Sequence, residues 1–196
     1  MLLESLKLVE QSLNTYLFQR LGGVAGVVDI SLGNVSAIEQ PGANLDDKLI
    51  ISLVNIEEER SLKNARSIRA NGLTGTLEYR NAPVSLNLYL LFSANFTNNY
   101  DKALRVLSLV IEFFQGNSTF RTPAPGAPGA LADGRAELTF NLYTMTFEQL
   151  NHLWGALGGK QLPSALYRVY LVQLEDAAAR EGGHLIEEVV GNETLA

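Results

Sequence analysis

Residues 49–56, LIISLVNI, carry apolar side chains at both odd and even positions. Successive side chains of a β-strand point to opposite faces of its sheet, so this segment would present apolar groups on both faces. A strand of this kind is stable where other elements cover both of its faces. The segment therefore predicts a central strand, and Glu57, Glu58 and Glu59 directly after it predict that the chain then emerges into solvent.

Further strands are predicted from shorter patterns. Apolar and polar side chains alternate over residues 28–32 and, most clearly, over 84–92. The segments 138–142 and 166–174 are also typical of strands. The long basic connection over 61–83 has no clear period, and a loop of that length is usually functional, mobile or both.

Two amphipathic segments predict helices within the first 116 residues. The first ends at Gly22-Gly23, and the second begins at Asn98 or Asn99 and ends at Gly116. Apolar residues three and four apart predict the buried stripes. These are Leu2, Leu6, Val9, Leu13 and Leu17 in the first helix, and Ala103, Leu104, Leu107, Val110, Ile111 and Phe114 in the second.

The segment FEQLNHLWGALGGKQLPS, residues 147–164, contains a Gly-Gly-Lys run that raises the alternative of a phosphate-binding loop. Such a loop needs Gly, four residues and then Gly-Lys-Ser/Thr, placed between a strand and the start of a helix. Here Gly155 stands one residue too close to the second glycine, and Gln161 replaces the hydroxyl residue. The apolar period also puts a helix before the glycines, which argues against phosphate binding.

Local signals predict both ends of this third helix. Thr146 and Gln149 form the pattern of a capping box, so the helix is expected to begin near Phe147. Gly158 supplies the left-handed residue that commonly closes a helix. We expect Trp154 to lie in the core.

The order helix, strand, strand, strand, helix, strand, helix, strand predicts an α+β fold, a mixed α/β layer with a mostly antiparallel central sheet and two to three packed helices. The length allows one sizeable core, so we expect one domain over 1–176 and a tail over 177–196. The tail has few apolar residues and is expected to fray or to dock on a neighbour. The Pro/Gly-rich stretch 122–134 is predicted to be a loop within the domain.

Chemistry-bearing residues are sparse. The chain has no cysteine and two histidines, so no disulfide, thiolate or cysteine-based metal site is expected. His152, one turn after Glu148, is interpreted as a surface residue rather than half of a catalytic pair. The run 57–59 could hold a hard cation, but on a strand its carboxylates point to opposite faces. We therefore predict no enzyme activity, no metal and no cofactor.

Charge is unevenly distributed. The chain carries −6 overall, which argues against nucleic-acid binding, and it has neither an export signal nor a membrane-spanning run. Residues 60–80 nevertheless hold five basic side chains and one acidic one, a net +4 that leaves −10 for the rest. The window is either a solvated loop or a basic arm that meets an acidic partner. The candidate contact residues are Arg60, Lys63, Arg66, Arg69 and Arg80, with Lys160 after the third helix.

Four blocks in the same order carry a resemblance to a known family. They are NIEEERSLKN (55–64), YRNAPVSLNLYLLFSANF (79–96), VIEFFQGN (110–117) and FEQLNHLWGALGGKQLP (147–163). Over about residues 3–176 the chain closely resembles the cap or terminator proteins of extracellular contractile injection systems, the phage-tail-like particles of the antifeeding-prophage and Photorhabdus-virulence-cassette kind.

The resemblance implies a phage tail-terminator-like fold and a structural role. The expected assembly is a hexameric ring at the tube end distal to the baseplate, which stops polymerisation and anchors the last sheath ring. Tube and sheath proteins are the expected partners, without direct membrane insertion. Assembly is expected in the bacterial cytoplasm, within a particle that is released or anchored. The alternative is an adaptor that links the particle to cargo or to an envelope surface.

Overall fold

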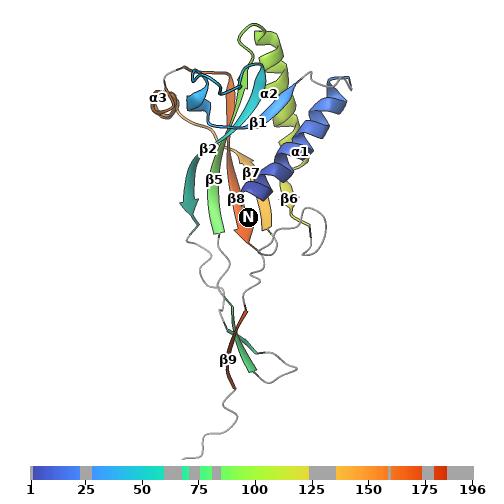
Figure 1. The fold of residues 1–196 in the computed structure, drawn as a ribbon, viewed down its shortest axis with the longest axis vertical. Helices are drawn as coiled ribbons and strands as arrows, with labels where there is room; N and C mark the ends of the chain where they lie inside the picture. Colours follow the sequence, from blue (N-terminus) through green and yellow to red (C-terminus); the bar gives the residue numbers. More distant parts are fainter. Residues whose placement is uncertain are drawn as a thin grey trace, which may run out of the picture.

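The computed structural model describes residues 2–22, 28–59, 68–70, 76–80, 85–123, 136–158, 160–173 and 179–184. Figure 1 shows a main sheet with helices on both sides and a smaller sheet beyond its lower end. The elements are α1 (Leu2–Arg20), β1 (Asp29–Leu32), the 3-10 turn η1 (Val35–Ala37), β2 (Lys48–Glu58), β3 (Ile68–Ala70), β4 (Thr76–Arg80), β5 (Ser85–Asn95), α2 (Tyr100–Gly116), β6 (Thr119–Arg121), β7 (Ala136–Leu142), α3 (Phe147–Ala156), β8 (Ser164–Gln173) and β9 (Ala179–His184).

The main sheet has six strands in the order β1-β2-β5-β8-β7-β6. Strand β1 pairs parallel to β2, and the other neighbouring strands pair antiparallel. Together with α1, α2 and α3 this arrangement confirms the predicted α+β class with a mostly antiparallel central sheet. The short strand β6 had no separate signal in the sequence, because three residues are too few to show a period.

The prediction for residues 49–56 is correct only for the first half of the segment. Leu49, Ile50 and Ile51 are buried, whereas Leu53 and Ile56 are 36% and 46% exposed. Strand β1 pairs only with residues 48–51, so the second half of β2 is a sheet edge, and the register shifts between residues 53 and 55. A register irregularity and exposed charged residues protect an edge from further pairing, and Glu57 and Glu58 lie exposed at this one.

Helices α1 and α2 cover one face of the main sheet and enclose the larger core. The predicted stripe of α1 is buried at Leu6, Val9, Leu13 and Leu17. Phe92 of β5 is fully buried in this core. Its ring centroid lies 5.2 Å from that of Phe114 and 5.5 Å from that of Tyr167. Burial of the side chain raises the pKa of Tyr167 to about 12, because the charged form would lose hydration.

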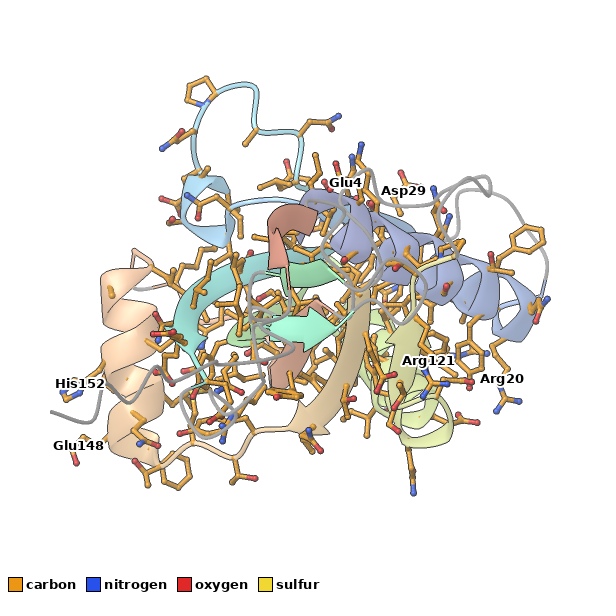
Figure 2. All side chains as sticks on the ribbon, turned by 90° about the horizontal axis from the view of Figure 1, so that it is seen from below. Glu4, Arg20, Asp29, Arg121, Glu148 and His152 are labelled. Carbon is orange, nitrogen blue, oxygen red and sulfur yellow. The ribbon has the colours of Figure 1, made fainter. Side chains whose placement is uncertain are left out.

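Helix α3 and η1 cover the opposite face, where Val35, Leu91, Trp154 and Leu166 form a second, smaller cluster. Figure 2 shows α3 on one side of the sheet and the two longer helices on the other. Trp154 is 4% exposed, which confirms its predicted core position. The second layer explains why β5 and the first half of β2 carry apolar groups on both faces.

Helix α2 begins where the sequence predicted, but its buried stripe is narrower than predicted. Asn99 is the N-cap, and its side chain accepts a hydrogen bond from the Lys102 backbone N–H. The predicted stripe is too wide, however, because Leu104 and Ile111 are 45% and 40% exposed. The helix turns these two side chains away from the sheet, and nothing in the described part of the chain covers them fully.

A second sheet, in the order β3-β4-β9, was not predicted. The connection over 61–83 contains β3 and β4, and the tail contributes β9. Both pairings are antiparallel. Strands β3 and β4 are close in sequence but short, and β9 follows β4 only after about a hundred residues, so the pairing of β4 with β9 leaves no local pattern. The Pro/Gly-rich loop lies mostly outside the described residues, and the division into a domain over 1–176 and a tail over 177–196 stays a prediction.

The predicted capping box of α3 is present. The Gln149 backbone N–H donates to the Thr146 hydroxyl at 3.2 Å, and the Thr146 N–H donates to the Gln149 side chain at 3.0 Å. Gly158 closes the helix with φ +109°.

Replacing Thr146 with alanine should therefore lower the free energy of unfolding by about 1 kcal/mol, because the Gln149 backbone N–H in the first turn of α3 loses its hydrogen-bond acceptor. The measurement is the urea midpoint of unfolding. Thr144→Ala is the matched control, since Thr144 is exposed two residues earlier. Equal midpoints for the two variants would show that the box contributes nothing.

Candidate interaction surfaces

The six predicted contact residues do not form one described surface. Arg60, Lys63 and Arg66 lie outside the described residues. Arg69 is on β3, in register with Glu78 of β4. Arg80 is on β4, in register with Ala179 of β9. The backbone thus brings part of the basic window and part of the C-terminal segment, predicted as two separate contacts, into one small sheet.

Lys160 is placed apart from that sheet, after α3. Its Nζ lies 3.5 Å from Glu39 Oε1, and the two side chains are 55% and 77% exposed. An exposed ion pair of this length contributes little to stability, because water and salt screen it. Lys160 is therefore accessible to a partner. The phosphate-loop alternative has no support in this geometry, since Gly158 ends a helix instead of preceding one.

A polar network on the α3 side of the main sheet joins strands β8 and β5 to Glu59, the residue that follows β2. Arg168 of β8 donates from Nε to Asn87 Oδ1 at 3.1 Å and lies 3.4 Å from Glu59 Oε2 through Nη2. Asn87 of β5 donates to the same Glu59 oxygen at 2.9 Å. Charge-assisted hydrogen bonds of this kind hold their partners in one geometry. The network fixes Glu59 at the point where the chain leaves β2.

A second polar contact lies on the same, α3-facing side of the main sheet. Tyr89 OH donates to Glu57 Oε2 at 3.1 Å. Burial, and then the hydrogen bond to the Glu57 carboxylate, raise the pKa of Tyr89. Glu57 and Glu59 therefore accept hydrogen bonds at the end of β2, which agrees with the interpretation of residues 57–59 as a charged strand end. Sequence reasoning missed the network, because its members lie on β5, on β8 and just after β2, and only the fold defines the register of these strands.

A groove runs along α3. It has a volume of about 270 Å³ and is lined by Phe147, Leu150, Asn151, Trp154, Gly155 and Gln161. Phe147 is 92% exposed, an unusual position for an aromatic ring. The buried Trp154 Nε1 has no hydrogen-bond acceptor within the described part of the chain. A large exposed aromatic residue beside a buried tryptophan resembles the centre of a protein–protein contact.

Gly155 is the last residue but one of α3 and borders this groove. A glycine in a helix costs up to about 1 kcal/mol relative to alanine, and less near the helix end. No atom lies within 4 Å of the place where a Cβ would stand, so packing inside the monomer does not require a glycine here. Gly155 therefore lines the groove with backbone alone, and a Cβ at this position would meet open space.

The described residues show no arrangement that favours catalysis. No group of three metal-ligating side chains occurs among them. Figure 2 shows Glu148 and His152 on the outer side of α3, where both point away from the sheet. No helix within the described ranges is long and apolar enough to cross a membrane.

Comparison with solved structures finds two that share this fold. One similar structure is the PVC sheath/tube terminator of an extracellular contractile injection system in the extended state. It is 16% identical with a TM-score of 0.64, and the match covers 100% of this chain and 64% of that chain. The other is the tube-terminating cap of the anti-feeding prophage, 17% identical with a TM-score of 0.58 over 93% of this chain and 60% of that chain.

The chain belongs to the family described as the Pvc16 N-terminal domain, whose profile matches residues 8–188. The resemblance seen in the sequence is thereby confirmed. The chain spans less than two thirds of the length of the two structures that it matches. No curated protein matches it.

Proposed function

We propose that this chain is the structural cap, or terminator, of a contractile injection system. In this role it forms a hexameric ring at the end of the tube and sheath distal to the baseplate, stops polymerisation and anchors the last sheath ring. The observation that carries the proposal is a fold shared over the whole chain with a protein described as a sheath/tube terminator. Membership in the Pvc16 N-terminal domain family supports the same role.

A capping role requires complementary surfaces rather than reactive groups. The α3 groove and the exposed apolar residues of α2 are surfaces available for such contacts, which supports this role. The similar structures are described as a terminator and a cap, which favours a non-enzymatic role for this chain as well. Assembly would take place in the bacterial cytoplasm before the particle is released or anchored.

The test is the length distribution of particles from cells with and without this gene, measured by electron microscopy. Deletion should produce overlong or ragged tubes without a closed distal end, and expression of the chain from a plasmid should restore the normal distribution. Particles of normal length and end shape after deletion would contradict the proposal and would favour an adaptor role.

We also propose that the basic window contacts an acidic surface of the tube, the sheath or a neighbouring subunit. Arg66→Glu with Arg69→Glu should reduce attachment of the chain to particles, because opposite charges then become like charges. The readout is the amount of chain that sediments with particles at about 50 and 500 mM salt, since salt screens exposed charges. Lys7→Glu with Arg20→Glu changes the charge equally outside the window. Equal attachment of both double variants would reject this contact.

A further inference from the structure

The small sheet continues three neighbouring strands of the main sheet. Strands β2, β5 and β8 are neighbours in the main sheet, and β3, β4 and β9 are neighbours in the small one. The chain passes from β2 to β3, from β4 to β5 and from β8 to β9. Each small strand is therefore joined to one of the three larger strands, and their order is the same in both sheets. Figure 1 shows the small sheet beyond the lower end of the main sheet.

All three connections leave the main sheet at the same end. Glu58, the last residue of β2, pairs with the second residue of β5, and Ser85, the first residue of β5, pairs with Val172 near the end of β8. In the small sheet, Arg80 at the end of β4 pairs with Ala179 at the start of β9. We call this end of the main sheet, where β2, β5 and β8 meet the three connections, the root of the small sheet.

At the root, strand β2 has a neighbour on one side only, because β1 pairs with it no further than Ile51. Glu59, directly after β2, provides additional contacts. Its backbone N–H donates to the Ser85 carbonyl at 2.9 Å. Its Oε2 accepts from the Asn87 amide at 2.9 Å and lies 3.4 Å from Nη2 of Arg168. The end of β2 is thus bound to β8 across the intervening β5.

The contact of Glu59 with Asn87 and Arg168, which we call the root contact, is partly shielded from water. The side chains of Glu59 and Arg168 are 18% and 45% exposed, and Asn87 is buried. Salt screens partly buried charges less than exposed ones. Strands β5 and β8 pair along their length without this contact, so its main effect falls on Glu59, where the chain leaves β2.

We propose that the root contact fixes the direction in which the small sheet leaves the main sheet. While the contact is made, the connection to β3 starts from a defined point at Glu59. When it is broken, the last residues of β2, paired on one side only, open locally and lengthen that connection.

A fixed direction also bears on binding. Strands β3 and β4 carry Arg69 and Arg80 of the basic window. A surface that is held in one direction before it meets a partner loses less conformational freedom on binding. This consequence rests on the proposed contact of the basic window, whereas the fixed direction does not depend on it.

Distances between two nitroxide labels test the proposal, because the chain has no cysteine of its own and labelling is specific. One label is attached at Thr76→Cys, the residue of β4 farthest along the strand from the root. The other is attached at Phe147→Cys, where the side chain is 92% exposed on α3. Pulsed electron paramagnetic resonance of the purified full chain should give one narrow distance distribution. A second label pair, Leu3→Cys with Phe147→Cys, reports on the main sheet and its helices.

Two substitutions break the root contact in different ways. Arg168→Met keeps most of the side-chain stem and removes the cation, and Asn87→Leu removes the amide at similar volume. Both should widen the 76–147 distribution by about a factor of two, because a strand end that loses a tertiary contact opens locally. The 3–147 distribution should keep its width in both variants.

Arg121→Met is the matched control. It removes an ion pair with Glu137 between β6 and β7, at the opposite edge of the main sheet, and should leave both distributions unchanged. A 76–147 distribution that stays narrow in the two root variants, or that is already equally wide in the unchanged chain, would overturn the proposal. Widening of both distributions would also overturn it, because the contact would then stabilise the whole fold.

The consequence for binding has a separate readout. Arg168→Met should sediment with particles less than the unchanged chain at about 50 mM salt, where screening of charges is weak. If the 76–147 distribution widens and attachment stays the same, the root contact is correct and the contact of the basic window is wrong. Unchanged particle lengths after deletion of the gene would contradict the capping function and leave the measured distances as they are.

Discussion

Replacing Phe92 with alanine should lower the free energy of unfolding by about 3–5 kcal/mol, a large part of the stability of a typical domain. Phe92 is fully buried in the core beneath α1 and α2. Its ring packs against Phe114 of α2 and Tyr167 of β8. The truncated side chain would leave a cavity that these rings can fill only partly.

Urea unfolding followed by circular dichroism measures this loss. Phe147→Ala is the matched control, because it makes the same chemical change at a ring that is 92% exposed. The control should stay within about 0.5 kcal/mol of the unchanged chain. A loss of the same size in both variants would mean that the core is not organised around Phe92.

Replacing Trp154 with alanine should cost a similar amount, about 3–5 kcal/mol, but in the other layer. Trp154 is buried against Leu91 and Leu166, so its removal takes away the largest side chain that holds α3 on the sheet. The amide protons of α3 should then exchange faster, while those of the strand β5 should keep more of their protection, because stability is not uniform across a structure.

Hydrogen exchange and circular dichroism are suitable measurements, since Trp154 is the only tryptophan and its fluorescence is lost in the variant. His152→Ala, at an exposed position of the same helix, is the control. If Trp154→Ala left stability unchanged and prevented only self-association, Trp154 would belong to the interface rather than to the core.

Sequence alone predicted the elements whose signals are local. The alternation over 84–92 defines β5, and the capping box with Gly158 defines both ends of α3. Four ordered blocks also carried the family resemblance. Such features are readable because each depends on residues a few positions apart, where hydrogen bonds and side-chain directions follow the helix or strand period.

Sequence could not predict which apolar residues the fold leaves exposed. Leu104 and Ile111 have the period of a buried stripe, and only the curvature and position of the sheet decide that they face outward. Leu53 and Ile56 likewise look central, but the strand β1 beside them ends too early to cover them. Exposure depends on what packs nearby, which no window of sequence contains.

Tertiary structure also decided every feature built from distant segments. The polar network joins Asn87 of β5 and Arg168 of β8 to Glu59 just after β2. The small sheet pairs β4 with β9, which follows about a hundred residues later in the sequence. A strand of three to six residues gains its stability from its partner, so its own residues need no distinctive pattern. The composition and the local periods of this chain determined its layers of helix and sheet. Strand register, sheet edges and exposed surfaces depend instead on contacts between segments that are distant in sequence, and only the folded structure defines those contacts.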